Sequence, residues 1–143
     1  MTSALPTVVE RHQSAYNSRS AAKVAEQYAD DATFQDPFLP QSLKGKTAVR
    51  QYHEGLFAAF PDFTVKTRRA VVAGDTVLLL GTASATNKGP IRTPDGKTIP
   101  PTNRKFGGDE YAVLFQLNKA GKIRSLRVYG DSLTIFKQLG LNP

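Results

Sequence analysis

The chain has 143 residues, a formal net charge of +7 and no cysteine, which excludes disulfides, thiolate metal sites and thiol nucleophiles. A chain of this length is expected to form one domain, over residues 1–143, and to bury about two thirds of its unfolded surface. Its two histidines argue against a zinc site, so we expect neither a metal nor another cofactor.

The positive charge is the one feature that points towards nucleic acid. However, the 19 Lys and Arg residues are scattered, with no run of five or six and no aromatic RNA-binding motif. We therefore expect a solvated basic surface, able to attract an anionic substrate, and no nucleic-acid partner. No apolar stretch approaches the ~20 residues that span a bilayer, and the opening MTSALPTVVERH does not resemble a signal peptide. The expectation is a cytoplasmic protein without membrane contact.

Helical signals dominate the first sixty residues. Residues 7–10 match a capping box that would begin a first helix, with His12 and Tyr16 on its inner face. Ser20 is predicted to cap a short second helix. That helix should stop at residues 30–31, because two aspartates at a helix C-terminus oppose the helix dipole.

A short strand is predicted over residues 33–38, followed by a longer helix over residues 47–59. Pro61 should end this helix, since the residue before a proline disfavours helical dihedral angles. The helix carries one broad apolar stripe, which includes Tyr52, His53 and Phe57.

From residue 63 the apolar period changes to two, which is typical of strands. Strands are predicted over residues 63–72, 76–85, 105–117 and 122–129. A long connection rich in Pro and Gly is predicted over residues 86–104. Gly107 and Gly108 should form a β-bulge that bends the sheet.

The last predicted helix begins at a Ser132 cap and stops at Gly140, with Leu133, Phe136 and Leu139 facing inward. Helices first and hairpin-linked strands afterwards indicate an α+β fold, with helices packed on one face of a curved antiparallel sheet. Helices over a bent sheet leave a cone with an open mouth, so we expect a pocket.

The expected pocket is mostly hydrophobic, because strand alternation turns the more apolar face of residues 105–117 and 122–129 towards the helices. Such a lining suits a hydrophobic small molecule with one or two polar groups. The residues expected to bind it are Phe34, Tyr52, His53, Phe57, Tyr111, Val113, Leu126 and Val128. Asp109, on the same face as Tyr111, would lie either at the cavity mouth or in solvent.

Asp36 stands between Phe34 and Phe38. Apolar surroundings disfavour an ionised carboxylate, so burial would raise the pKa of Asp36 towards the range of a general base. Alternatively, Asp36 caps the turn before Pro37. His12 carries a similar pair of interpretations, a working group or a half-buried histidine bonded to a carbonyl. The residues alone leave both questions open.

Two regions resemble enzymes of one superfamily, the cone-shaped nuclear-transport-factor-2-like fold. YADDATFQDPF (28–38) with GKTAVRQYH (45–53) resembles the ketosteroid isomerases, whereas the second half resembles the SnoaL-like polyketide cyclases. That second resemblance includes FPD (60–62), PPTNR (100–104) and QLGL (138–141). The resemblance covers almost the whole chain, and it implies the cone-shaped fold and a homodimer that pairs through the convex face of the sheet.

The isomerase resemblance implies that Asp36 is the proton-shuttling acid. It puts the isomerases' oxyanion-binding tyrosine at His12 and their second oxyanion donor at Val113, whereas the cyclases' catalytic aspartate falls at Val128. Neither catalytic set is complete. We therefore expect isomerase- or cyclase-type proton transfer on a hydrophobic carbonyl compound, with Asp36 as base and with His12 and Tyr16 polarising the oxygen. A non-catalytic binding protein and a dimeric interaction module remain as alternatives.

Overall fold

The structure is a computed structural model that describes residues 5–141. Its four helices are α1 (Thr7–Asn17), α2 (Ala21–Glu26), α3 (Lys46–Ala59) and α4 (Ser132–Leu139). Its strands are β1 (Tyr28–Gln35), β2 (Leu43–Lys44), β3 (Thr64–Ala73), β4 (Thr76–Thr86), β5 (Ile91–Arg92), β6 (Thr98–Ile99), β7 (Lys105–Leu117) and β8 (Ile123–Gly130). Within residues 5–141, none of the helices has the length and apolar character that a membrane crossing requires.

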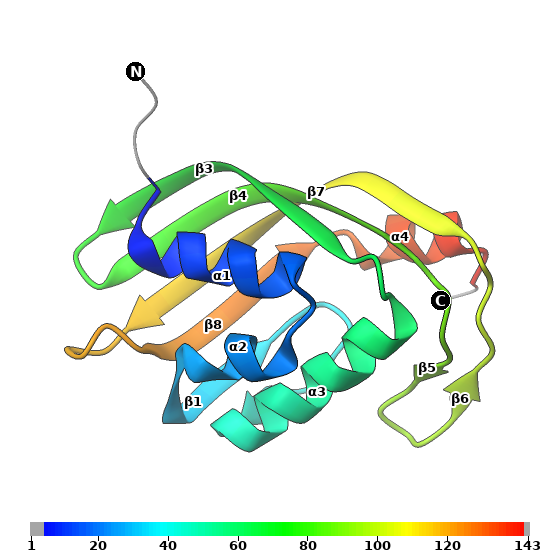
Figure 1. Cartoon of the computed structure of the whole chain (residues 1–143), viewed down its shortest axis with the longest axis horizontal. Coiled ribbons are helices and arrows are strands. Elements are labelled where there is room, and N and C mark those ends of the chain that lie inside the picture. The colour runs from blue at the N-terminus through cyan, green and yellow to red at the C-terminus, as the bar shows by residue number, and fades with distance from the viewer. Residues whose placement is uncertain (1–4, 142–143) are drawn as a thin grey trace.

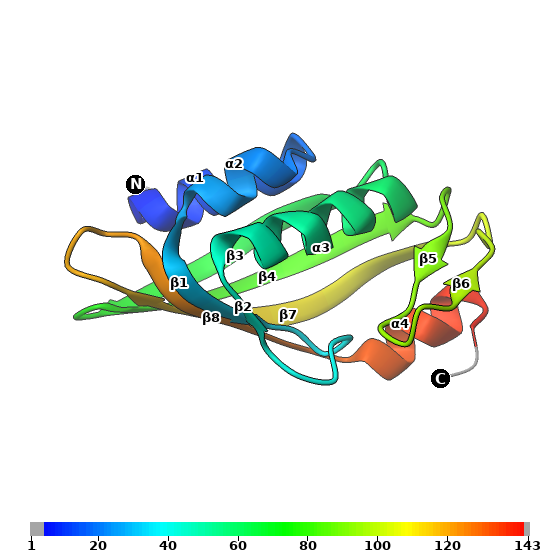
Figure 2. The same ribbon diagram turned by 90° about the horizontal axis from the view of Figure 1, so that it is seen from below.

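Six strands form one curved sheet in the order β2-β1-β8-β7-β4-β3. The pairs β7–β8, β4–β7 and β3–β4 are antiparallel, as expected, whereas β1 pairs with β8 in parallel. The helices α1, α2 and α3 lie on one side of this sheet, and α4 lies at its far end (Figure 1, Figure 2). The α+β expectation is confirmed, with the difference that the sheet is mostly rather than wholly antiparallel.

The main core lies between the sheet and the three N-terminal helices. Alternate residues of β4 and β7 face it, and Leu79, Val113 and Phe115 are fully buried there. A smaller cluster, which includes Phe60 and Leu139, packs against the sheet at the C-terminal ends of α3 and α4. Burying a side chain such as Phe115 contributes about 1.5–3 kcal/mol.

The predicted bulge at Gly107 and Gly108 is confirmed. The pairing of β4 with β7 shifts register between Ala83 and Ala85, opposite these glycines. Gly108 has a φ of +72°, a left-handed conformation that glycine adopts without steric cost. The extra residue bends β7 around the helices.

Two details of the N-terminal helices differ from the sequence prediction. The N-cap of α1 is Pro6, so Thr7 is already helical and makes no capping bond. Ser20 caps α2 as predicted. However, α2 ends at Glu26, and the aspartates at 30–31 lie in β1. The chain turns earlier because Tyr28 begins the strand, with its side chain buried near Phe34.

The last helix also differs in detail. Asp131, not Ser132, caps α4, because the Asp131 carboxylate accepts the backbone N–H of Thr134 at 3.0 Å. Leu139 is buried as predicted, and Gly140 ends the helix with a φ of +77°. Leu133 was predicted to face inward, but it is 46% exposed. A helix that packs only one side on the end of the sheet has room for few inward positions.

Asn87 anchors the long connection between β4 and β7. Its side chain is fully buried, donates to the carbonyls of Ala59 (3.3 Å) and Gly89 (2.8 Å), and accepts the backbone N–H of Thr102 at 2.8 Å. The connection, predicted as a long segment rich in Pro and Gly, contains the short hairpin of β5 and β6. Sequence reasoning did not identify Asn87, since a single Asn in a polar loop carries no distinctive signal.

Replacing Asn87 with Ala is expected to lower the free energy of unfolding by about 1–3 kcal/mol, because a buried backbone N–H loses its acceptor. Urea unfolding measures the loss, and amide hydrogen exchange should accelerate at Thr102. Gln51→Ala, at an exposed position of α3, is the control and should change stability by less than ~0.5 kcal/mol. Equal stability of the two variants would show that Asn87 does not hold the connection.

Candidate functional site

Asp36 directly follows the last residue of β1 and is only 8% exposed. One carboxylate oxygen, Oδ1, accepts the backbone N–H of Phe38 at 2.9 Å, and the other, Oδ2, accepts the hydroxyl of Tyr52 on α3. The turn-cap interpretation of Asp36 is therefore confirmed. The burial that a raised pKa requires is present in the same residue, so the two interpretations are compatible.

Burial raises the pKa of Asp36 above its usual value of 3.8. The hydrogen bonds from Tyr52 and from the backbone N–H of Phe38 oppose this rise, because they stabilise the ionised form, but they do not cancel it. The carboxylate is thus a stronger base than an ordinary aspartate, and it is held in one orientation by two donors.

Replacing Tyr52 with Phe is expected to raise the pKa of Asp36 further, because the ionised carboxylate loses its strongest hydrogen-bond donor. Side-chain carbon NMR of the Asp36 carboxyl group, followed through an acid titration, measures this pKa directly. Phe63→Leu, at another half-buried aromatic without a bond to Asp36, should leave the midpoint unchanged. A lower midpoint in Tyr52→Phe would contradict the assignment of the hydroxyl as donor.

Tyr16 and His53 form a buried pair between α1 and α3. The His53 Nδ1 lies 2.7 Å from the carbonyl oxygen of Val49, which can only accept, so Nδ1 carries the proton. The Nε2 atom therefore accepts the hydroxyl proton of Tyr16. Burial lowers the pKa of His53 to about 4. Since Tyr16 donates its proton to a neutral His53, its oxygen offers the interior only lone pairs.

His12, one turn before Tyr16, is also buried, at 3% exposure. Its ring lies 4.5 Å from that of Tyr16 and meets Phe115 edge-on at 5.2 Å. Burial, and secondarily His53, lowers the pKa of His12 to about 3, so the ring is neutral at pH 7. Its Nδ1 has no hydrogen-bond partner among residues 5–141.

Four further polar groups are buried without a partner in the described part of the chain. They are the side-chain oxygen of Gln27, the hydroxyls of Tyr28 and Tyr111 and one carboxylate oxygen of Asp109. The expected placement of Tyr111 and Asp109 on the inner face agrees with their pairing opposite Gly81 and Ala83 of β4. Tyr28 was not anticipated, because it lies where a helix was predicted. The strand alternation of Tyr28, Ala32 and Phe34 could have indicated it.

The expected lining residues are distributed through the main core and its margins. Phe34, His53, Phe57, Val113 and Leu126 are buried, whereas Tyr52, Tyr111 and Val128 are half-buried. The ring of His53 packs against those of Phe34 and Phe57. The interior next to Asp36 is therefore packed with aromatic side chains.

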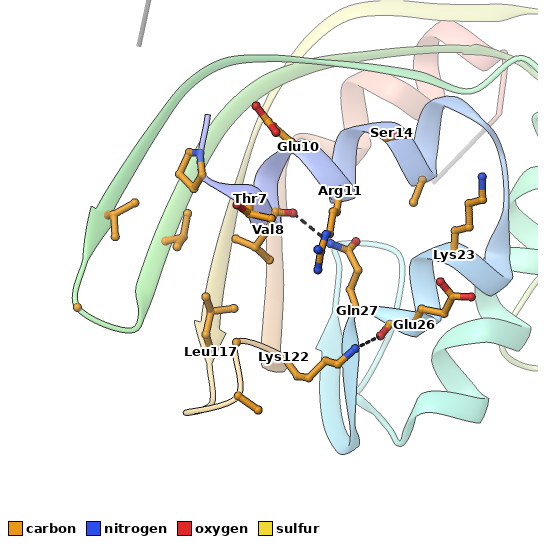
Figure 3. Close-up of a pocket in the computed structure, with 17 residues that line it drawn as sticks. Thr7, Val8, Glu10, Arg11, Ser14, Lys23, Glu26, Gln27, Leu117 and Lys122 are labelled. Carbon is orange, nitrogen blue, oxygen red and sulfur yellow. Dashed lines mark hydrogen bonds between the residues drawn. The ribbon is translucent and has the colours of Figure 1, made fainter. Parts of the chain in front are cut away.

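Two hollows of the structure lie away from Asp36, which lines neither of them. One, of about 770 Å³, lies between α1 and the ends of the sheet hairpins. In this hollow Gln27 donates to the carbonyl of Val8 and Lys122 to that of Glu26 (Figure 3). The other, of about 670 Å³, lies on the outer face of the sheet.

The loop after β1 contacts α4 through an aromatic pair. Phe38, two residues beyond Asp36, packs edge-on against Phe136 of α4, with ring centroids 5.5 Å apart. Phe38 itself is 37% exposed.

The comparisons with known proteins agree with this architecture. The family model of the SnoaL-like domain matches residues 9–126, whereas no curated protein sequence matches the chain. A Catenulispora acidiphila protein with a ketosteroid isomerase-like fold, crystallised with trimethylamine, is 19% identical over 97% of this chain and 96% of its own, with a TM-score of 0.80.

Two further structures have the same fold. IdmH from Streptomyces antibioticus, assigned as a polyketide cyclase, is 23% identical over 94% of this chain and 96% of its own, with a TM-score of 0.72. An LEH-like epoxide hydrolase of M. tuberculosis is 18% identical over 92% and 86%, with a TM-score of 0.70. At such identities the likeness establishes the cone-shaped fold and leaves the reaction open.

Proposed function

Because the chain belongs to the SnoaL-like domain family, we propose that it is a small-molecule enzyme in which Asp36 transfers a proton of a hydrophobic carbonyl substrate. The observation that carries this proposal is the Asp36 carboxylate itself. This carboxylate is buried beside aromatic rings and oriented by two hydrogen bonds. Burial also raises its pKa. A base of this kind contributes about 10²–10⁴-fold to a proton-transfer rate.

In the proposed reaction the Asp36 carboxylate removes a proton from the carbon next to the carbonyl group. The electron pair of the broken C–H bond moves to the carbonyl oxygen, which becomes an enolate. In a conjugated substrate the enolate oxygen re-forms the carbonyl group, the neighbouring C=C bond shifts, and the protonated Asp36 returns the proton to the far carbon, which gives an isomer. In a cyclisation the enolate carbon instead attacks a second carbonyl carbon of the substrate, the π electrons of that C=O bond move to its oxygen, and this oxygen takes the proton from Asp36. Tyr52 stays bonded to the carboxylate through both steps and keeps it aimed.

The enolate oxygen requires hydrogen-bond donors, and the interior offers several candidates. His12 stays in the proposal as a polarising group, because its Nδ1 has no partner among the described residues. Tyr16 would have to release His53 before it could donate. The hydroxyl of Tyr111, which is buried and without a partner there, needs no such exchange. Each donor of this type is typically worth around 100-fold in rate or more.

The proposal is tested by incubating the protein in D₂O with a panel of hydrophobic ketones and following loss of the α-proton signal by NMR. Catalysed exchange of at least one ketone is the expected result. Ketones that raise the melting temperature of the protein but are recovered without deuterium would contradict the enzyme proposal.

That outcome would favour the second candidate, a binding protein for a hydrophobic metabolite. One observation supports it specifically, since both carboxylate oxygens of Asp36 already accept structural hydrogen bonds. The family resemblance points the same way, because it puts Val128 and Val113 at the positions of the cyclase and isomerase acids.

We also propose that the chain forms a homodimer through the outer face of the sheet. Strand register aligns Leu80, Ala112 and Tyr129 in one row across β4, β7 and β8. Leu80 and Tyr129 are 40% and 48% exposed, and Val71 on β3 is 43% exposed. Exposed apolar side chains gathered on one sheet face are typical of a protein interface.

Replacing Leu80 with Lys is expected to convert the dimer to a monomer, because two copies would bring like charges into one apolar contact. Light scattering should give twice the chain mass of 15.6 kDa for the parent protein and the single mass for the variant. Leu133→Lys, at an exposed leucine of α4, should remain dimeric. A parent protein of single mass would refute the dimer.

A further inference from the structure

Basic residues are confined to the outside of this protein. All 19 Lys and Arg side chains lie within residues 5–141, and none of them is buried. Lys46 is the one that is half-buried, and its Nζ lies 4.0 Å from a carboxylate oxygen of the exposed Asp30. No fixed cation among the described residues therefore reaches the interior around Asp36.

The interior groups are acidic or neutral. His12 and His53 are both uncharged at pH 7, because burial lowers their pKa values to about 3 and about 4. Asp36 offers a carboxylate, and Tyr16, whose proton goes to His53, offers an oxygen that can only accept. Asp36 and Tyr16 thus add hydrogen-bond acceptors, and no positive charge, to the interior between the helices and the sheet.

An unpartnered carboxylate oxygen strengthens this asymmetry. It belongs to Asp109, on the inner face of β7, and it is buried without a hydrogen-bond partner among residues 5–141. A ligand that donates hydrogen bonds and carries positive charge would satisfy a carboxylate oxygen of this kind, whereas an anion would be repelled by it.

The ring faces of the interior favour the same ligand charge. Phe34, Phe57, Phe115 and Tyr16 surround the two histidines, with centroid separations of 4.5–6.0 Å from a histidine ring. Aromatic faces carry negative potential and attract cations within about 6 Å. An anion moved into these surroundings would lose its hydration and gain no opposite charge.

We propose that the site takes a hydrophobic molecule carrying a protonated amine and rejects carboxylates, an inference that rests on the proposed ligand site beside Asp36. The surface predicts the reverse order, since a net charge of +7 raises the local concentration of anions. A preference for cationic ligands would therefore indicate binding in the interior, whereas a preference for anionic ligands would indicate binding at the surface.

Three small probes of one shape test the inference at pH 7: benzylammonium, benzyl alcohol and benzoate. His12 and His53 are the chain's two histidines and both are buried, so their imidazole C–H signals in ¹H–¹³C NMR report on the interior and ignore binding to surface lysines. We expect benzylammonium to bind about tenfold more tightly than the alcohol, and benzoate about tenfold more weakly.

Asp36→Asn keeps the shape of the side chain and removes its charge, so it should lower the preference for benzylammonium over the alcohol by about tenfold. Asp95→Asn, at an exposed loop position, is the matched control and should leave the preference unchanged. The inference is overturned if benzoate matches the alcohol, if benzylammonium binds no more tightly than the alcohol, or if no probe shifts the imidazole signals. A protein with the expected probe order that exchanges no ketone proton would lose the enzyme proposal and keep this one.

Discussion

Replacing Asp36 with Asn is expected to lower the rate of ketone α-proton exchange by about 10²–10⁴-fold, the contribution of a positioned general base. An amide cannot accept the substrate proton at neutral pH. Its oxygen can still accept the backbone N–H of Phe38, and the Tyr52 hydroxyl can turn to accept from the amide nitrogen. The variant should therefore fold and bind ligands while losing turnover.

Exchange rates measured by NMR in D₂O, together with melting curves, check this expectation. Asp31→Asn, at an exposed aspartate of the same strand β1, is the control and should exchange at the parental rate. Parental turnover in Asp36→Asn, with the fold intact, would eliminate Asp36 as the base.

The same substitution has a predictable effect on stability. Burial raises the pKa of Asp36 in the folded protein above the 3.8 of the unfolded chain, so the folded state holds the proton more tightly. Stability then falls as pH rises from about 3.8 through the folded pKa, because ionisation is easier in the unfolded chain. The amide side chain of the Asp36→Asn variant does not titrate. As pH rises through this window, the free energy of unfolding of the parent protein should therefore fall relative to that of the variant.

The second large effect concerns Phe115, where replacement with Ala is expected to cost about 3–5 kcal/mol of unfolding free energy. Phe115 is fully buried on β7, faces the helices and meets the ring of His12 edge-on at 5.2 Å. Its removal leaves a cavity bounded by a rigid sheet, which can collapse only in part. A loss of this size is a large share of the roughly 5–15 kcal/mol that stabilises a typical domain.

Urea unfolding at 25 °C measures the cost. The control is Leu80→Ala on the outer face of the neighbouring strand, where the leucine is 40% exposed and should cost about 1 kcal/mol or less when measured on the monomeric protein. A cost below that of the control would mean that the helices close over the missing ring. In that case the interior around His12 would be adaptable rather than rigid.

Local patterns along the chain were sufficient for most of the fold. The period-two stretches correspond to β3, β4, β7 and β8 within one or two residues, and the apolar stripe over 47–59 corresponds to α3. These signals survive because each is set by neighbours three or four residues apart in a helix, or two apart in a strand. The family resemblance supplied the cone, which agrees with the family match over residues 9–126.

Helix ends and the first strand were less accurate, for a physical reason. Where α2 ends depends on Tyr28, which leaves the helix to pair beside β8, a strand about 95 residues later that meets Tyr28 at Ile123. Such a parallel pairing leaves no mark in the local sequence. The aspartates at 30–31 fit the end of a helix and the exposed face of an edge-side strand equally well.

Composition and periodicity thus settled that this chain is an α+β domain with an apolar interior and an acid at the end of its first strand. Only the tertiary structure decided that the Asp36 carboxylate accepts a hydrogen bond from the Tyr52 hydroxyl, and that the Tyr16 hydroxyl donates to His53. It also decided that the rings of Phe38 and Phe136 pack against each other. These partners are 16, 37 and 98 residues apart in the chain. A hydrogen bond or ring contact over such separations follows from how α1, α3 and α4 are placed against the sheet, and no local pattern encodes that placement.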